Sequence, residues 1–263
     1  MASYTHGHHE SVLRSHNTRN IANSAEYLRP HLGASTRLLD VGAGPGTITM
    51  DFASVVDRVT ATEIDEAALS LSRELAASRG VTNVDFSVED VHALSFADDS
   101  FDVVHAHQVL QHVADPVQAL REMRRVTVPG GIVAARDADY AGFIWFPLLP
   151  ELDRWLELYR AAARANGGEP DAGRQLLSWA RQAGFTDVRA TASTWCYATP
   201  AERAWWGGMW ADRILESALA RQLVREDRAT TTDLQAISDA WKRWADAEDG
   251  WYLVPHGEIL CRA

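Results

Sequence analysis

Residues 38–49 read LLDVGAGPGTIT, and this stretch decides the fold. An apolar run ends in Asp40 and is followed by glycines at every second position, Gly42, Gly44 and Gly46. Glycine at a strand-to-helix turn lets the backbone approach a ligand closely, and the helix that follows offers unpaired N–H groups at its positive end. The stretch therefore predicts a ligand bound at the turn between a first strand and a first helix.

Strands and helices alternate along the first half of the chain. Runs typical of strands cover residues 37–40, 58–63, 84–88, 101–105 and 131–137. Such alternation predicts an α/β, doubly wound, parallel sheet with helices on both faces. The helix after the second strand has Asp65 as an N-cap and Gly80 as a stop. A Pro-Gly-Gly turn at 129–131 is expected to launch the fifth strand.

The second half reads as helical insertions that decorate the same sheet. Insertions are expected at about 147–183 and 200–246, a strand between them at 185–198, and a last strand at 251–263. The final two helices are expected at 201–221 and 232–245. Before the sheet, residues 8–28 read as a helix. We therefore expect an N-terminal helical lid over 1–36 and one domain over 37–263.

Composition limits the class of protein. A chain of 263 residues, 46% of them hydrophobic, can bury one large core. The net charge of −11 argues against a nucleic-acid partner, which favours a basic surface. No apolar run approaches the ~20 residues of a membrane span, the N-terminus is too polar for a signal peptide, and two cysteines fit a reduced compartment, so we expect a cytoplasmic protein. The histidines lack the fixed spacing of a metal site, and no metal is expected.

The residues after the second and third strands limit the class of ligand that could bind. Thr47 stands where the third glycine of a dinucleotide fingerprint would fall, which argues against a nicotinamide-dependent oxidoreductase. Glu63 could accept both hydroxyls of a ribose, a role that suits NAD and adenosyl ligands equally. Asp90 could accept from an adenine amino group while the Val91 N–H donates to the ring.

Four stretches occur in one order over about residues 37–135: LLDVGAGPGTIT, VTATEID, EDVHALSFADDSFDVVHAHQVLQHVADPVQALREMRRV and VPGG. In this order and spacing the chain resembles the class I S-adenosylmethionine-dependent methyltransferases, of the ubiquinone/menaquinone-biosynthesis type (methyltransferase type 11 or 25-like). The resemblance implies a Rossmann-like, seven-stranded sheet with an antiparallel last strand. It also implies S-adenosyl-L-methionine as the cofactor.

The resemblance also implies a role for individual residues. Glu63 would hold the ribose, Ile64 would pack on the adenine, and His107 would lie near the methionine amino group or the methyl. Alternatives remain open, because Ile64 could be core, Asp40 could only tie down the loop, and His107 could be a packed histidine. The expected cofactor-binding residues are Arg19, Asp40, Gly42, Ala43, Gly44, Gly46, Glu63, Ile64, Asp90, Val91 and His107.

Differences from better-characterised methyltransferases limit the range of possible methyl acceptors. The Asn-Pro-Pro-Tyr run of many amine methyltransferases is replaced by residues 106–108, which argues against nucleobase and glutamine amines. Quinone methyltransferases usually carry an Arg-Asn pair where this chain has Gln111 and His112, so their substrate cannot be carried over. We expect a small, largely apolar or aromatic metabolite, methylated at carbon, oxygen or nitrogen by in-line displacement.

Candidate bases and acceptor contacts follow from their predicted places on the carboxyl edge of the sheet or in the aromatic-rich segments. The candidate bases are His107, His112 and Asp139. The candidate acceptor contacts are His16, Tyr140, Trp145, Trp195 and Trp206. The tryptophans could instead pack the inserted helices onto the sheet.

A second function from another class remains open. A chain that keeps the cofactor pocket without turnover would serve as a sensor or partner subunit. The apolar inserted helices could also pair between two chains as a homodimer.

Overall fold

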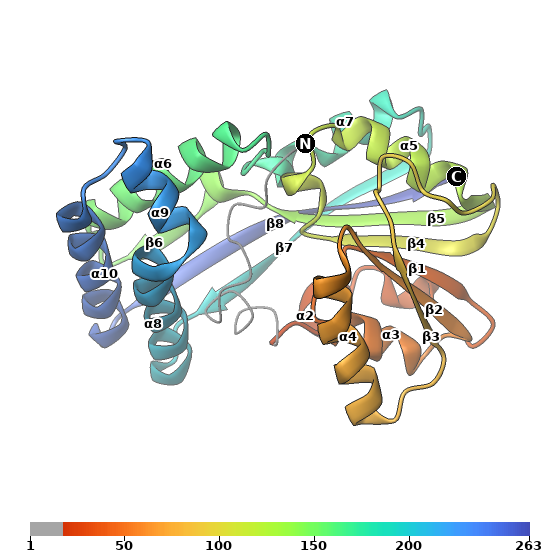
Figure 1. The fold of residues 1–263 in the computed structure, drawn as a ribbon, viewed down its shortest axis with the longest axis horizontal. Helices are drawn as coiled ribbons and strands as arrows, with labels where there is room; N and C mark the ends of the chain where they lie inside the picture. Colours follow the sequence, from red (N-terminus) through yellow and green to blue (C-terminus); the bar gives the residue numbers. More distant parts are fainter. Residues whose placement is uncertain (1–17) are drawn as a thin grey trace.

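The computed structural model describes residues 18–263, which form an eight-stranded mixed sheet with a group of helices at one end (Figure 1). The strands are β1 (Arg37–Val41), β2 (Arg58–Glu63), β3 (Val84–Val88), β4 (Phe101–His107), β5 (Thr127–Ala138), β6 (Ile144–Phe146), β7 (Val188–Tyr197) and β8 (Trp251–Arg262). The α-helices are α2 (Ile21–Ser24), α3 (Thr47–Ala53), α4 (Glu66–Arg79), α5 (Pro116–Arg125), α6 (Pro150–Ala165), α7 (Leu176–Gln182), α8 (Pro200–Glu216), α9 (Ala218–Arg225) and α10 (Thr231–Asp246). Within the described residues, no helix combines the length and apolarity that crossing a membrane requires.

The sheet has the order β3-β2-β1-β4-β5-β8-β6, and β7 pairs with β8. Strands β1 to β5 are parallel, whereas β8 runs antiparallel to β5, β6 and β7. The predicted doubly wound sheet with an antiparallel last strand is therefore confirmed. The short β6 is an addition: Ala138 at the end of β5 pairs with His256, and Ile144 of β6 pairs with Leu253 further along β8.

Local sequence explains most element boundaries. The Asp65 side chain accepts a hydrogen bond from the Ala68 N–H at the start of α4, and Gly80 ends the helix in the left-handed conformation, as predicted. The predicted start of the fifth strand is wrong, because β5 begins at Thr127. Residues 129–131 form an irregularity within the strand, where the pairing with β4 shifts register.

Two predicted helices differ from the structure. The helix expected over 201–221 is broken at Ser217, whose extended backbone ends α8 and begins α9. The Ser217 side chain makes no cap hydrogen bond to α9, so the extended backbone of this residue defines the boundary. Of the helix expected over 8–28, residues 8–17 lie outside the described residues. The described part holds only the short α2, where Asn20 and Asn23 form a capping box.

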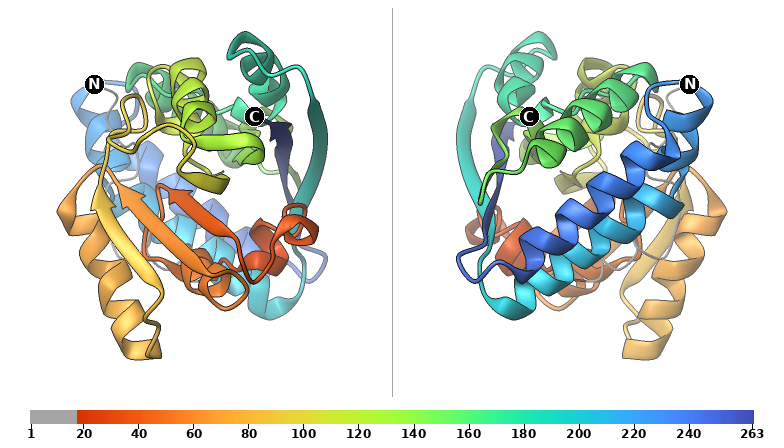
Figure 2. Two further views of the ribbon diagram at one scale, coloured as in Figure 1. Left: turned by 90° about the vertical axis from the view of Figure 1, so that its right-hand side faces the viewer. Right: turned by 90° about the vertical axis from the view of Figure 1, so that its left-hand side faces the viewer.

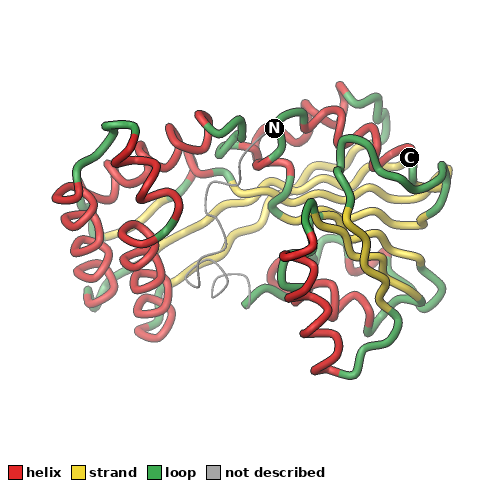
Figure 3. The backbone as a smooth tube through the Cα atoms, in the orientation of Figure 1, coloured by secondary structure: helices red, strands yellow, loops and turns green. Residues whose placement is uncertain are grey.

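Three apolar clusters position the functional edge of the sheet. One lies between the sheet and α5 and α7, and a second lies between the opposite face and α2 and α3. The third joins the far end of β8 to α6, α8, α9 and α10, and its large buried rings include Trp155, Trp210, Trp241 and Tyr252. Figure 3 shows β7 and β8 running from the parallel strands to these helices, and Figure 2 shows α8 and α10 side by side. We call α6, α8, α9 and α10 the helical bundle.

Adjacent glycines in α8 test the packing of the helical bundle. A methyl group at Gly207 would lie 2.8 Å from the Cβ of Ala245 and 2.8 Å from the carbonyl oxygen of Trp241, whereas nothing lies within 4 Å at Gly208. Gly207→Ala should lower the free energy of unfolding by about 1–3 kcal/mol through overpacking. Gly208→Ala should raise it by about 0.5–1 kcal/mol through helix propensity. Urea unfolding of both variants measures the difference, and equal effects would contradict the packing described.

Candidate active site

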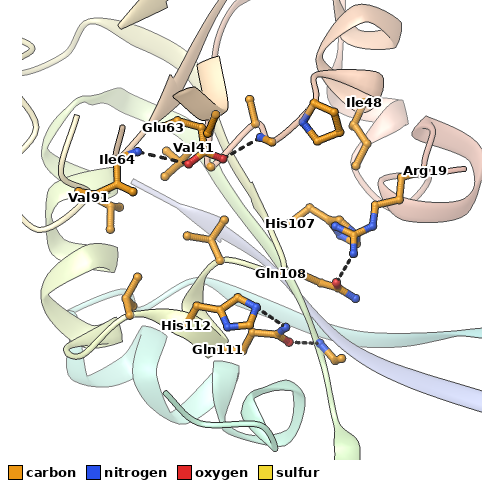
Figure 4. A pocket seen from close by; sticks show the side chains of 18 of the residues that line it. Arg19, Val41, Ile48, Glu63, Ile64, Val91, His107, Gln108, Gln111 and His112 are labelled. Atoms are coloured by element: carbon orange, nitrogen blue, oxygen red, sulfur yellow. Dashed lines mark hydrogen bonds between the residues drawn. The ribbon is translucent and has the colours of Figure 1, made fainter. Parts of the chain in front are cut away.

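A cavity of about 640 Å³ lies along the carboxyl ends of the parallel strands and extends to the helical bundle. This volume falls within the range of small-molecule sites, and the carboxyl edge is where open α/β sheets bind ligands. One end of the cavity is formed by the turn after β1 and the ends of β2 and β3 (Figure 4). Residues of β7, β8, α8 and the segment after β5 form the other end.

The turn between β1 and α3, residues 42–46, is called the glycine turn. It is fixed by packing, and part of it lines the cavity. Gly42, Gly44 and Gly46 all have positive φ, which favours glycine. A Cβ at Gly42 would lie 2.5 Å from Val109 Cγ2, and one at Gly46 would lie 2.2 Å from Ser72 Oγ. Gly42, Ala43 and Gly44 line the cavity. The structure does not bring Gly46 to the cavity wall and uses it instead where α3 begins against α4.

The end of β2 presents a fixed carboxylate beside an exposed aliphatic side chain. Glu63 accepts hydrogen bonds from the Gly44 N–H (2.8 Å) and the Ile64 N–H (3.2 Å) (Figure 4). Ile64 is 62% exposed although it is large and apolar, and it lines the cavity together with the buried Val91. The alternative reading of Ile64 as a core residue is therefore wrong.

Two aspartates of the predicted site have different surroundings. Asp90 lines the cavity and accepts from the His92 N–H at 2.9 Å, a hydrogen bond that lowers the pKa of its carboxyl group. Asp40 is buried and accepts from Thr49 Oγ1 at 2.6 Å, and its other oxygen lies 2.8 Å from Nδ1 of His105. The Asp40 carboxylate therefore ties α3 and β4 to the turn, although the residue borders the cavity.

A hydrogen-bonded chain connects Arg19 with the sheet. Arg19 donates to Gln108 Oε1 at 2.6 Å, and Gln108 Nε2 lies 2.9 Å from Nε2 of His256. Nδ1 of His256 lies 3.1 Å from the Val254 carbonyl, so the ring can donate there and accept from Gln108. Burial lowers the pKa of His256 well below its usual value, which keeps the ring neutral. This series of hydrogen bonds holds the Arg19 side chain at the cavity wall (Figure 4).

His107 is the predicted candidate base that presents unpartnered ring nitrogens. It is 6% exposed, lines the cavity, and neither ring nitrogen has a hydrogen-bond partner among residues 18–263. Burial, and then the positive charge of Arg19, lower the pKa of His107 well below its usual value. Its ring centre lies 5.9 Å from that of Trp195. A neutral imidazole therefore faces the cavity.

The other two candidate bases are differently placed. His112 lines the cavity, but its Nε2 accepts from the Gln111 side-chain amide at 2.9 Å, and burial lowers its pKa to about 3. Asp139 does not line the cavity. Its two carboxylate oxygens accept from the guanidinium of Arg174 at 2.6 and 2.5 Å. The expectation that Asp139 faces the ligand is therefore wrong.

The predicted acceptor contacts divide into three groups. Tyr140, Trp195 and Trp206 line the cavity. Trp145 does not, because it stacks on Tyr252 (ring centres 5.7 Å apart) in the core of the helical bundle. His16 lies outside the described residues.

Sequence reasoning did not select several residues of the cavity wall as site residues. Trp206, Trp210 and Arg213 are spaced i, i+4 and i+7 on α8, which places them on one helix face. That spacing was available in the sequence and could have identified Arg213. The unselected residues with rings or polar side chains at this end are Phe143, Tyr197 and Arg213.

Comparisons with known proteins agree with this architecture. The methyltransferase domain family matches residues 32–189. An uncharacterized methyltransferase of Schizosaccharomyces pombe is 32% identical and covers 98% of this chain and 95% of its own length. A probable methyltransferase of Aspergillus luteorubrus is 28% identical and covers 98% and 96%. A solved putative methyltransferase of Bacillus halodurans has a TM-score of 0.59 at 18% identity, covers 90% and 97%, and shares the fold.

The chain belongs to the methyltransferase family. Within it, the sheet order and the predicted motifs make the protein a class I S-adenosylmethionine-dependent methyltransferase, and its cofactor is S-adenosyl-L-methionine.

Protonation of His112 should couple folding to pH. Its pKa is about 3 in the folded protein and near 6.5 in the unfolded chain, so the unfolded chain alone takes up a proton as the pH falls below 6.5. This coupling should lower the free energy of unfolding by about 2 kcal/mol between pH 7 and 5. His112→Asn should remove that part of the pH dependence, measured by urea unfolding at several pH values.

The difference between the pH profiles of wild type and His112→Asn gives the contribution of His112 to the free energy of unfolding. Asp137, whose pKa burial raises to about 7, changes stability in the opposite direction but does so in wild type and variant alike. Parallel pH profiles for the two proteins would contradict the neutral, buried state of His112.

Proposed function

We propose that this protein transfers the methyl group of S-adenosylmethionine to a small, largely apolar or aromatic metabolite, at carbon, oxygen or nitrogen, by in-line displacement. One observation carries the proposal: a single cavity joins two unlike ends. Carboxylates and the glycine turn line one end, and flat aromatic rings line the other. A cavity of this kind can hold a polar cofactor and an apolar acceptor next to each other.

The residues at the carboxylate end fit the cofactor. Glu63 offers acceptor oxygens for the ribose hydroxyls, and the exposed Ile64 gains an apolar partner if an adenine covers it. Asp90 and the Val91 N–H would read the adenine edge, and the Arg19 guanidinium suits the methionine carboxylate. The backbone of residues 42–44 would lie against the methionine part.

The bound cofactor supplies a methyl group on a positively charged sulfur, which is already activated for displacement. The protein mainly has to align the nucleophile, and orientation can supply up to about 7–11 kcal/mol of a barrier. His107 is the candidate that suits contact with the acceptor, as a neutral hydrogen-bonding group. A base is needed where the nucleophile must lose a proton, and the low pKa of His107 makes it a weak one.

We propose that residues 1–36 serve as a lid and that 37–263 form one domain with insertions. Two contacts support the lid: Arg19 donates to Gln108, and the Asn23 carbonyl accepts from the Trp195 indole at 2.6 Å. We further propose a cytoplasmic protein without a nucleic-acid partner, in keeping with the net charge of −11. Light scattering at several protein concentrations would test for a homodimer.

Removal of the Glu63 carboxylate should weaken cofactor binding. A charge-assisted hydrogen bond contributes about 1.5–3 kcal/mol. Glu63→Ala should therefore raise the Kd for S-adenosylhomocysteine by about 30-fold or more, measured by calorimetry. Glu66→Ala is the matched control, because Glu66 lies outside the cavity in the next helix, and its Kd should stay within twofold of wild type. A near-normal Kd for Glu63→Ala would refute the assignment.

The function itself is tested by incubating the protein with methyl-labelled S-adenosylmethionine and a cell extract, followed by separation of the products by size and polarity. Label in the small, apolar fraction would support the proposed function. Label in protein or nucleic acid would contradict it. An unlabelled extract, together with measured binding of S-adenosylhomocysteine, would favour the sensor or partner subunit.

A further inference from the structure

His92 holds the carboxylate of Asp90 at the wall of the cavity. Both residues follow β3 and line the cavity. The His92 backbone N–H donates to Oδ1 of Asp90 at 2.9 Å, and Nδ1 of the His92 ring lies 2.7 Å from the same oxygen. No described residue donates a hydrogen bond to Oδ2, and more than half of the Asp90 side chain is exposed. His92 therefore occupies one oxygen of the carboxylate and leaves the other open to a ligand.

The start of α5 fixes the His92 ring from its other side. The Asp115 N–H donates to Nε2 of His92 at 3.4 Å, so Nε2 is the acceptor and the proton on Nδ1 goes to Asp90. The Gln118 side-chain amide also donates to the His92 carbonyl at 3.2 Å. Asp115 and Gln118 are joined in the first turn of α5, where the Asp115 side chain caps the helix. The orientation of the ring therefore depends on a helix that packs against the sheet.

These hydrogen bonds limit the rotation of the Asp90 carboxylate. The terminal torsion of an aspartate is broad when nothing restrains it. Two donors on Oδ1 leave one orientation in which both are satisfied, and this orientation gives Oδ2 a fixed direction. A carboxylate oxygen accepts and does not donate, so it suits an amino group and opposes a carbonyl oxygen. A carboxylate held in this way before a ligand binds loses little freedom on binding.

We infer that His92 is a positioning residue of the cofactor site, which holds Asp90 so that its Oδ2 accepts from the adenine amino group and disfavours a 6-oxo purine. This inference rests on the proposed function, in which Asp90 reads the adenine edge. It adds a residue that acts through Asp90 and a consequence for specificity. The site should distinguish adenine from hypoxanthine, and part of that distinction should depend on the His92 ring.

Two ligands that differ only in the purine test the inference. S-adenosylhomocysteine carries an amino group at C6, whereas S-inosylhomocysteine carries an oxygen at C6 and a hydrogen on N1. The oxygen would face Oδ2 of Asp90 without a shared proton, and the N1 hydrogen would meet the Val91 N–H. Wild type should therefore bind S-adenosylhomocysteine about 30-fold or more tightly than S-inosylhomocysteine, measured by calorimetry.

Removal of the His92 ring should reduce this preference. His92→Ala should weaken binding of S-adenosylhomocysteine about tenfold and change binding of S-inosylhomocysteine by less than about threefold, because only the amino group uses the fixed Oδ2. His92→Asn keeps a side-chain N–H donor near the place of Nδ1 and should bind both ligands within about threefold of wild type. His31→Ala is the matched control, because His31 is an exposed histidine before β1 and is not part of the described cavity wall. It should bind both ligands as wild type does.

A double-mutant cycle shows whether His92 acts through Asp90. Asp90→Ala should itself lose most of the preference for adenine. Addition of His92→Ala to Asp90→Ala should weaken binding of S-adenosylhomocysteine by less than about threefold further, because no carboxylate is left to position. A full additional loss in the double variant would contradict action through Asp90.

Other results would also overturn the inference: wild type binds both ligands equally, His92→Ala binds S-adenosylhomocysteine as wild type does, His92→Ala weakens both ligands to the same extent, or His92→Asn fails to restore the preference. Equal weakening of both ligands would assign His92 a purely structural role in the loop before α5. Wild type that binds neither ligand would refute the proposed function itself. Normal binding of S-adenosylhomocysteine to wild type, together with any of the overturning results, would refute only this inference.

Discussion

The hydrogen bond from the Gly44 N–H to the Glu63 carboxylate joins the ends of two neighbouring strands, and the organisation of the cavity depends on it. The bond forms because the chain after β1 can fold back in left-handed conformations, which glycine tolerates. Packing demands the same residues, since Gly42 lies against Val109 and Gly46 lies against Ser72. The turn is thus fixed from both sides before any ligand binds, and preorganisation of this kind reduces the cost of binding.

The antiparallel strand β8 connects the cavity with the apolar core of the helical bundle. It pairs with β5 beside the parallel strands and continues to β6 and the helical bundle, so one strand joins the parallel sheet to the bundle end of the cavity. His256 in the middle of β8 accepts from Gln108, which in turn holds Arg19. The neutral state of His107 and His256 follows from burial and from the nearby arginines, which lower the pKa of both rings. Carboxylates therefore gather at the glycine-turn end of the cavity, whereas aromatic rings of β7 and α8 line the other end.

Periodicity and motif spacing predicted the parallel sheet, the cap of α4 and the positions of Glu63 and Asp90, because these features depend on residues close in the sequence. Features set by distant partners were not predicted. Asp139 is paired with Arg174, 35 residues later, and no local pattern indicates that pair. Trp145 faces the bundle core because β6 pairs with β8, more than 100 residues away. The helical spacing that leads to Arg213 is local, but its meaning depended on which face of α8 meets the cavity.

A crystal structure with S-adenosylhomocysteine would show directly how this cavity holds the cofactor. We expect the ribose hydroxyls on Glu63, the adenine between Ile64 and Val91, and the sulfur directed toward His107 and the aromatic end of the cavity. A ligand bound elsewhere, or bound with its ribose away from Glu63, would refute the assignment of the cofactor-binding residues.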